Sequence, residues 1–292
     1  MPTRKNPCAL RNARKLRAMA LLLIFGAGGC RHGASGPFDA AYEQLAARAT
    51  TQGNERAAVE DFAGAAEAYD KALRYWPGCA TAHMGAGRAA EALGDADKAI
   101  EHFGEAVKHA PSESVYAVAL GDALRRKAVT SMDREALVDA ALRAYRHALS
   151  IDTRSRRAAQ GIGLCHRING RTDQAIEAFR HAARMDDGSA EPHFLLAGLY
   201  ESLSRYPESM RAYRVALKLA PEDARIHNAC AAMNARLADV GGPSRRLARQ
   251  RAIAHYRRSL EIVPDQPKVI TEMEKLGGNG PRWLAGGAES DE

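Results

Sequence analysis

The sequence predicts an all-α protein, an α-solenoid of about six helical hairpins closed by a C-terminal capping helix. Composition and periodicity lead to this prediction. The 292-residue chain contains 59 Ala but only 28 Val, Ile and Thr together, a balance that favours helices over sheets. Charged residues make up 26% and hydrophobic residues 46%, which argues against a disordered, collagen-like or polytopic membrane chain.

One aromatic residue recurs along the chain at intervals of 34, 42, 34, 34 and 43 residues: Tyr69, Phe103, Tyr145, Phe179, Tyr213 and Tyr256. An Ala or Ser lies four residues before and three residues after each of them. These spacings place both small residues and the aromatic on one helical face, where a neighbouring helix can approach closely. Gly94 and Gly170 fall at matching turn positions, so each unit is predicted to be a helical hairpin.

This 34-residue pattern resembles the tetratricopeptide repeat family. The match is best in residues 80–113, where Gly87, Gly94, Phe103 and Pro111 stand at the positions that the family's pattern expects. The predicted units are residues 38–79, 80–113, 114–155, 156–189, 190–223 and 224–266, followed by a cap at 267–276. The glycine-rich tail, residues 277–292, is predicted to be disordered.

Three units depart from the regular length. The third has about eight extra residues around 126–139 and the sixth about nine around 239–248, which predict lengthened hairpins or enlarged turns. Gly241-Gly242-Pro243 favours a loop in the sixth unit. In the first unit, Gly53 fits the regular length, whereas Leu45-Ala46 fits a first helix lengthened by about seven residues.

The N-terminal segment has six basic residues and no acid, then an apolar run at 18–25 that is too short to span a bilayer, then small residues up to Cys30. This layout resembles a bacterial lipoprotein signal, although Ala27 stands where Leu is usual. The resemblance implies removal of residues 1–29, lipidation of Cys30 and a linker at 30–37. Arg31 in place of Asp favours the outer membrane, facing the periplasm; inner-membrane anchoring and secretion are the alternatives.

Most of the net charge of +7 lies in the predicted leader and is lost if the leader is removed. Because residues 1–29 carry six basic side chains and no acid, the remaining chain has 36 basic and 35 acidic residues. A nearly neutral chain does not favour nucleic-acid binding, which needs a surplus of Lys and Arg on one face. A local cluster persists at 245–258, with six Arg and no acid.

Catalytic and metal-binding motifs are not evident in the sequence. There is no HExxH, GxxxxGK[ST] or GxSxG, so no catalytic residues, cofactor or enzyme activity are predicted. Cys79, Cys165 and Cys230 lie in different units without CxxC spacing, so neither a metal site nor a disulfide framework is indicated. Cys165 and Cys230 are predicted to be buried and Cys79 to be a free thiol in a loop. His83, His193 and His227, at the fourth position of their units, are predicted to pack.

The family resemblance implies a partner-binding groove lined by the first helix of each hairpin. Its predicted residues are Arg88, Arg125, Arg157, Gln160, Leu164, Arg167, Phe194 and Asn228. Because Arg pairs with carboxylates, the expected partner is an extended peptide or helix that mixes acidic and apolar residues. No nucleic acid or small-molecule substrate is expected.

The predicted function is a non-enzymatic, membrane-anchored scaffold that assists assembly of an envelope complex, for a pilus, a secretion system in the manner of a pilotin, or polysaccharide export. The alternative is an accessory subunit of a membrane enzyme complex in cytochrome maturation or cell-wall synthesis. The residues do not separate these roles.

Overall fold

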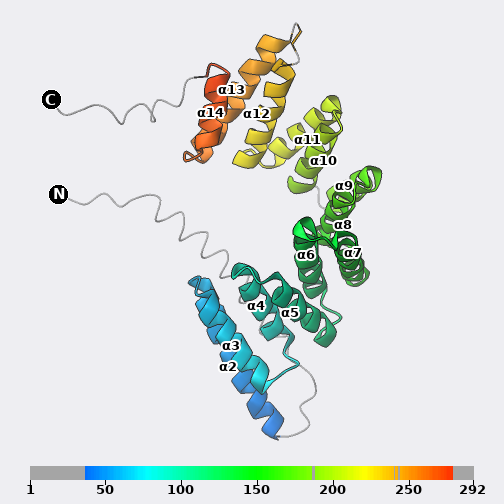
Figure 1. Cartoon of the computed structure of the whole chain (residues 1–292), viewed down its shortest axis with the longest axis vertical. Helices are drawn as coiled ribbons and strands as arrows, with labels where there is room; N and C mark the ends of the chain where they lie inside the picture. Colours follow the sequence, from blue (N-terminus) through cyan, green and yellow to red (C-terminus); the bar gives the residue numbers. More distant parts are fainter. Residues whose placement is uncertain (1–36, 186–187, 240, 243, 279–292) are drawn as a thin grey trace, which may run out of the picture. The chain divides into compact units, whose positions relative to one another are not determined.

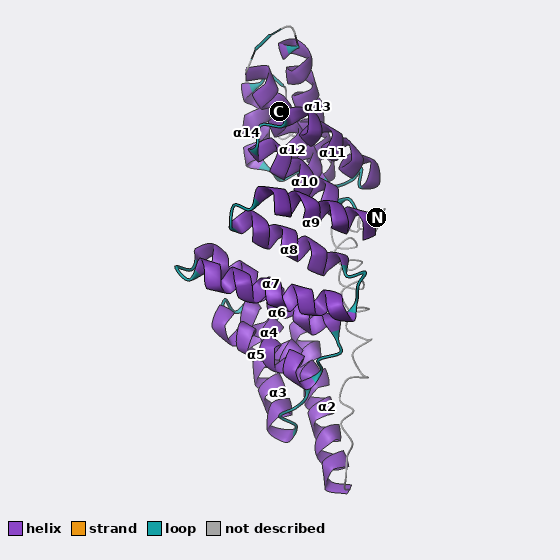
Figure 2. Ribbon diagram, turned by 90° about the vertical axis from the view of Figure 1, so that its right-hand side faces the viewer, coloured by secondary structure: helices purple, strands orange, loops and turns teal. Residues whose placement is uncertain are grey.

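The computed structural model describes residues 37–185, 188–239, 241–242 and 244–278, and this part of the chain contains helices and turns but no strand (Figure 2). The all-α prediction is therefore confirmed. The helices are α2 (Pro37–Ala58), α3 (Phe62–Tyr75), α4 (Ala80–Ala92), α5 (Ala96–His109), α6 (Ser114–Thr130), α7 (Arg134–Ile151), α8 (Arg156–Ile168), α9 (Thr172–Met185), α10 (Glu191–Ser202), α11 (Tyr206–Leu219), α12 (Ala224–Asp239), α13 (Arg245–Ile262) and α14 (Pro267–Lys275). None of these helices is long and apolar enough to cross a membrane.

The chain divides into two compact units, Met1–Gly170 and Arg171–Glu292. In the first unit, α2 pairs with α3, α4 with α5 and α6 with α7, and α8 packs on α6 and α7. In the second, α9 packs on α10, α10 pairs with α11, α12 with α13, and α14 packs on α13 (Figure 1). The hairpin prediction is confirmed for α2–α3, α4–α5 and α6–α7 in the first unit and for α10–α11 and α12–α13 in the second. The division falls at the turn between α8 and α9, the two helices of the predicted fourth hairpin.

The core of each hairpin is built around the recurring aromatic residue. Tyr145, which is fully buried, lies so close to Gly121 of α6 and Gly161 of α8 that a Cβ at either glycine would come within 2.7 Å of a ring carbon. Gly53 and Gly85 hold the Tyr69 ring in the same way. Small residues therefore serve the fold by letting three helix backbones close on one ring.

Turn chemistry repeats from hairpin to hairpin. Gly94 and Gly170 have positive φ angles of 83° and 69°, as their turn positions predicted. Glu60 and Ser204 occupy the same place in their hairpins, with φ of 62° and 57°. At the start of α3, the Asp61 carboxylate accepts a hydrogen bond of 3.0 Å from the Gly64 N–H, so this acid caps the helix.

The extra residues of the third hairpin lengthen its helices. α6 has 17 residues and α7 has 18, against 13 in α4 and 14 in α5, so each helix gains four residues, about one turn. In the sixth hairpin α12 has 16 residues and α13 has 18, and the connection also grows. Gly241 and Gly242 in that connection have φ of 85° and 90°, in agreement with the loop prediction.

The first hairpin has the regular register. Gly53 packs against Tyr69 as Gly87 packs against Phe103, and Leu45 is 38% exposed, so the lengthened register based on Leu45-Ala46 is wrong. α2 instead continues nine residues upstream of a regular 13-residue first helix, to 22 residues.

At the other end of the chain, α14 caps α13 as predicted, with Met273 fully buried in a cluster with Tyr256 and Leu260. Gly277 and Gly278, assigned by sequence to a disordered tail, close α14 by donating hydrogen bonds to the carbonyls of Glu274 and Met273. The described end of the cap therefore extends two residues beyond its predicted bound at 276.

Candidate peptide-binding groove

A hollow of about 260 Å³ lies in the first unit, between α4, α6 and the start of α8. Its floor is apolar, because Phe103 and Val118 are buried there and Met84 is only 9% exposed. Charged side chains border this floor. The full lining is Met84, Arg88, Glu91, Phe103, Ser114, Val115, Val118, Ala119, Asp122, Arg126, Ser155 and Arg157.

Asp122 is the centre of a polar network at the edge of this hollow. The residue is 6% exposed, and its Oδ1 accepts a hydrogen bond of 2.7 Å from the Tyr145 hydroxyl. Its Oδ2 pairs with Arg157 at 2.9 Å to Nε and 2.7 Å to a terminal nitrogen. Arg125 adds a third contact, 3.8 Å from Oδ1. A buried carboxylate needs such partners, because an isolated charge in the interior costs several kcal/mol.

Arg88 differs from its neighbours in the hollow, because no ion pair of its side chain occurs among the described residues. Burial lowers the pKa of Arg88, and the positive charge of Arg157 lowers it further. By contrast, Arg126 forms an ion pair with Glu91 across the hollow. Arg88 and Arg157 thus border the apolar floor. The two acids of the lining, Glu91 and Asp122, already have basic partners.

The remaining predicted groove residues of this unit lie outside the hollow. Arg125 is turned toward Tyr145, whose hydroxyl lies 3.4 Å from its Nε. Gln160 and Leu164 on α8 are partly buried, and Gln160 Nε2 has no hydrogen-bond partner within the described part of the chain. Burial lowers the pKa of Arg167, and repulsion from Arg125 contributes to the shift. The structure therefore brings together Arg88 and Arg157 of the predicted set.

Phe194 and Asn228 belong to the second unit. The arginine next to Phe194, Arg225, already forms ion pairs there. Arg225 lies over the Phe194 ring at 5.7 Å and pairs with Asp223 at 2.8 Å and Glu191 at 3.1 Å. Asn228 Nδ2 donates to Gln266 Oε1 at 2.7 Å, next to the start of α14. Phe194 remains partly exposed beside these charges.

Tyrosine in place of phenylalanine at the recurring aromatic position is a signal that the sequence reasoning missed. Tyr69 donates to Asn54 at 2.7 Å, Tyr145 to Asp122, and Tyr213 to Glu201 at 2.9 Å. In each case the acceptor is on the first helix of the same hairpin. A hydroxyl at the end of a buried ring thus fixes a polar side chain of the helix that forms the groove.

Two family models described as tetratricopeptide repeat match the chain, one at residues 50–114 and 133–190 and the other at residues 166–233. Together they cover more than half of the sequence. The chain belongs to the tetratricopeptide repeat family. Tetratricopeptide repeat proteins generally mediate protein–protein interactions, and their fold typically serves as a non-catalytic scaffold.

Solved structures similar to this repeat protein agree on the fold. A thermophilic repeat protein of the same family from Thermus thermophilus is 24% identical, with a TM-score of 0.52, and the match covers 62% of this chain and 94% of that chain. Pseudomonas aeruginosa pilF is 16% identical, with a TM-score of 0.59 and coverage of 80% and 99%. MamA is 23% identical, with a TM-score of 0.50 and coverage of 59% and 96%. No curated protein sequence matches the chain.

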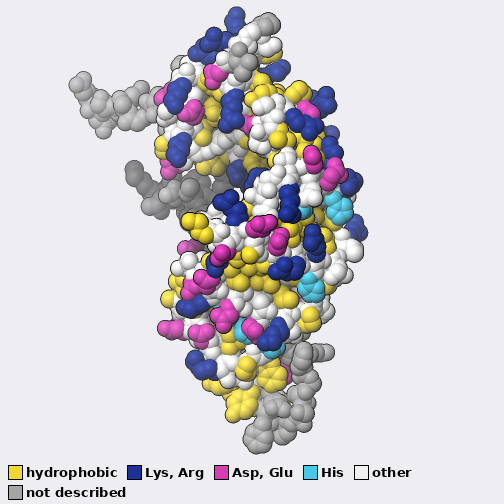
Figure 3. All heavy atoms as spheres, turned by 45° about the vertical axis from the view of Figure 1, so that its right-hand side comes forward, with side chains coloured by type: hydrophobic (Ala, Val, Ile, Leu, Met, Phe, Trp, Pro, Cys, Tyr) yellow, Lys and Arg dark blue, Asp and Glu magenta, His cyan; other side chains and the backbone are white. Residues whose placement is uncertain are grey.

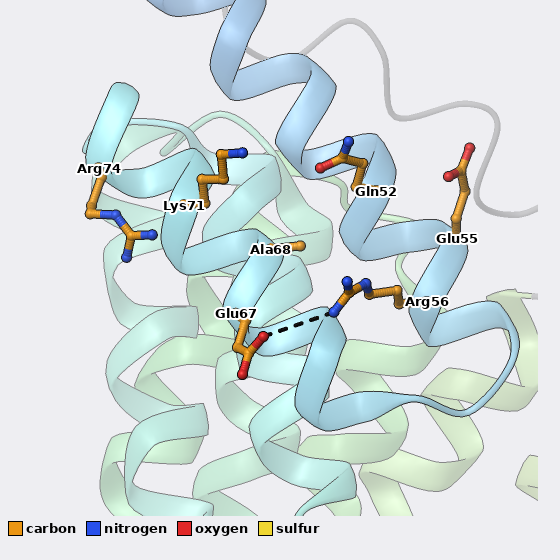
Figure 4. Close-up of a pocket in the computed structure, with 7 residues that line it drawn as sticks. All are labelled: Gln52, Glu55, Arg56, Glu67, Ala68, Lys71 and Arg74. Carbon is orange, nitrogen blue, oxygen red and sulfur yellow. Dashed lines mark ion pairs between the residues drawn. The ribbon is translucent and has the colours of Figure 1, made fainter.

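A second hollow, of about 470 Å³, is lined by side chains of α2 and α3 (Figure 4). Apart from Ala68, its lining consists of polar or charged side chains, among them Arg56, which lies 3.9 Å from both Asp61 and Glu67. Exposed pairs at this distance contribute little. The hollow between α4, α6 and α8 is smaller but has the buried apolar floor that a binding site needs.

The face of the molecule in Figure 3 mixes both signs of charge. Lys and Arg side chains lie among Asp and Glu side chains there, with apolar surface between them. In the basic segment at 245–258, Arg258 pairs with Glu222 and Glu261, and Arg249 donates to the Leu276 carbonyl. Part of this cluster therefore serves the packing of the last hairpin and its cap.

The cysteines and histidines lie mostly inside the hairpins. Cys79, Cys165 and Cys230 are all buried, as predicted for Cys165 and Cys230. Cys79 lies in the connection before α4, as the sequence predicts, and it is fully buried there. His83 and His227 are buried and His193 partly buried, as expected.

One group of three described side chains could hold a metal ion, namely His83, Glu105 and His109. The sequence reasoning missed this group because it treated each histidine singly. His102, Glu105 and His109 share one face of α5 at spacings of three and four residues, and that spacing was the available signal. Cys30, the predicted lipidation site, lies outside the described residues, as does the leader.

Proposed function

We propose that this chain is a protein-binding scaffold whose first unit captures an acidic, partly apolar segment in the hollow between α4, α6 and α8. The observation that carries the proposal is the pair Arg88 and Arg157 beside the apolar floor formed by Met84, Phe103 and Val118. Burial, and after it the charge of Arg157, lowers the pKa of Arg88. A carboxylate of a partner would offset both effects, while an apolar side chain would cover the floor.

The chemistry of the partner follows from this lining. Arg binds carboxylates with two parallel hydrogen bonds, and such charge-assisted bonds are stronger than neutral ones. A residue that fills the apolar floor would bury its side chain at the centre of the contact, where binding energy concentrates. A peptide or helix with Asp or Glu one turn from Leu, Phe or Met fits both requirements.

A crosslinking experiment in the native host tests this proposal. A photoreactive amino acid at Val115, which lines the hollow and is 49% exposed, should crosslink a discrete partner identifiable by mass spectrometry. Arg88→Glu should remove most of that crosslink, because it replaces the cation that has no ion pair in the described chain. Arg143→Glu, on an exposed site of α7, is the matched control and should leave the crosslink unchanged. Equal crosslinking in all three proteins, with equal helicity by circular dichroism, would exclude the hollow.

The cellular setting of the proposal comes from the N-terminal sequence. We propose an outer-membrane lipoprotein, anchored through Cys30, with its repeats in the periplasm; the basic leader, the short apolar run and Arg31 support this. In that setting the scaffold would assist assembly of an envelope complex, for a pilus, secretion or polysaccharide export. The identity of the crosslinked partner distinguishes this role from an accessory subunit of a membrane enzyme complex.

A further inference from the structure

Three histidines and a glutamate meet between the two helices of the second hairpin. His83 extends from α4, and His102, Glu105 and His109 share one face of α5. His83 is buried and the other three are partly buried. This cluster is separate from the hollow that carries the proposed function, whose lining includes none of the four.

The hydrogen bonds of His83 determine which of its ring nitrogens can act as a ligand. Its Nε2 lies 2.9 Å from the Pro77 carbonyl oxygen, which only accepts, so Nε2 carries the hydrogen and Nδ1 carries the lone pair. Metal-ligating histidines commonly donate their second ring N–H to a carbonyl in this way, which fixes the orientation of the ring. His102 Nδ1 lies 3.2 Å from His83 Nδ1, so the His102 N–H donates to this lone pair, and a metal ion bound at His83 Nδ1 would replace that hydrogen.

The spacing of the donor atoms suits a small ion. One potential ligand atom from each of His83, Glu105 and His109 lies within 4.8 Å of the other two. His109 Nε2 and Glu105 Oε2 are 3.4 Å apart. Two ligands at the usual 2.0–2.1 Å from a tetrahedral Zn²⁺ lie about 3.3–3.4 Å apart, so the 3.4 Å separation of His109 Nε2 and Glu105 Oε2 matches one edge of such a site.

The sixth hairpin contains half of this arrangement. His227 Nε2 lies 3.0 Å from the Pro221 carbonyl and its Nδ1 lies 3.2 Å from His255 Nδ1, as in the second hairpin. Aligning Tyr256 with Phe103 places Arg258 and Ile262 at the positions of Glu105 and His109. The paired histidines alone are thus a packing device of the fold. Glu105 and His109 are the additions that packing does not require.

We propose that His83, Glu105 and His109, with His102 as a neighbouring fourth donor, bind one divalent transition-metal ion of the Zn²⁺ class and thereby clamp α4 to α5. Imidazole nitrogen with one carboxylate oxygen is a donor set that Zn²⁺ and Co²⁺ accept readily. Glu105 must first leave Lys108, whose Nζ lies 3.0 and 3.1 Å from its two oxygens. That ion pair is exposed, so breaking it costs little free energy.

Cobalt titration of the full-length chain without a histidine tag tests the proposal. Co²⁺ should produce the visible absorption of a tetrahedral site at one equivalent, and Zn²⁺ should displace it. His109→Ile, which copies the sixth hairpin, and Glu105→Gln should each weaken Co²⁺ binding at least about tenfold. Circular dichroism should show unchanged helicity in both variants.

The sixth hairpin supplies the control. His255→Ala removes one histidine of the incomplete pair and should leave the stoichiometry and affinity for Co²⁺ unchanged. Absence of a one-equivalent tetrahedral spectrum would overturn the proposal, as would wild-type affinity in His109→Ile. Loss of binding in His255→Ala would place the ion in the wrong hairpin and would overturn it too.

Discussion

Tyr145 is a single residue on which both the core and the groove depend. Its ring fills the space between Gly121 and Gly161, and its hydroxyl donates to the buried carboxylate of Asp122, which in turn holds Arg157. The period of the sequence predicted the ring but not the role of the hydroxyl. Only the packing of α6 against α7 brings residues 122 and 145 together.

Replacing Tyr145 with Phe should lower the free energy of unfolding by about 1–2 kcal/mol, because a buried carboxylate oxygen loses its donor. Urea denaturation followed by circular dichroism measures this change. Tyr256→Phe is the control, since no hydrogen bond of the Tyr256 hydroxyl occurs in the described chain, and it should change stability by less than about 0.5 kcal/mol. Equal effects of the two substitutions would contradict the role of the hydroxyl.

Buried cysteine thiols and a buried tyrosine hydroxyl should make the free energy of unfolding depend on pH in the alkaline range. Burial raises the pKa of Cys165 and of Cys230 from 9.0 to about 12, and that of Tyr69 from 10.0 to about 12. A folded-state pKa above the unfolded value favours the neutral form in the folded protein. The resulting stability is fully present below pH 9 and is lost as pH rises toward 12.

The urea midpoint should therefore fall steadily between about pH 9 and pH 11. Cys165→Ala should reduce the slope of that fall, even if its stability at neutral pH is lower, because one titrating group is gone. A midpoint that is constant over this range would show that these groups ionise equally in the folded and unfolded chain.

At the scale of helices and hairpins, glycine positions separate into two kinds. A Cβ at Gly161 would overlap the Tyr145 ring, whereas a Cβ at Gly104 in α5 would meet nothing within 4 Å. Both residues lie inside helices, so sequence context alone does not distinguish them. The difference lies in the neighbouring helix.

Gly161→Ala should destabilise the protein by about 1–3 kcal/mol through overpacking, and Gly104→Ala should stabilise it by about 0.5–1 kcal/mol through lower chain entropy. Thermal unfolding of the two variants beside the wild type measures both signs. A stabilising Gly161→Ala substitution would contradict the close packing of α8 on Tyr145.

For the whole molecule, the N-terminal segment is proposed to determine where the repeats operate. Cys30→Ala should move the protein from the membrane fraction to the soluble fraction of the native host, because the anchor is lost while the helical units are untouched. Cell fractionation with immunodetection measures the shift. Membrane association that is unchanged in Cys30→Ala would refute lipidation at Cys30. If the leader is not cleaved, the mass of the isolated protein will include residues 1–29.

The sequence by itself determined the helical class, the hairpin period, the turn glycines and the capping helix, because these depend on local spacing: small and aromatic residues at helical periodicity, and Gly where φ is positive. Tertiary structure decided the rest. Whether Gly53 or Leu45-Ala46 sets the first hairpin depends on which residue meets Tyr69. Arg157 in the groove forms an ion pair only because Asp122, 35 residues earlier in the chain, lies next to it in the folded protein. Charges and donor atoms become a site only when separate helices bring them within a few ångströms, and no local pattern encodes that distance.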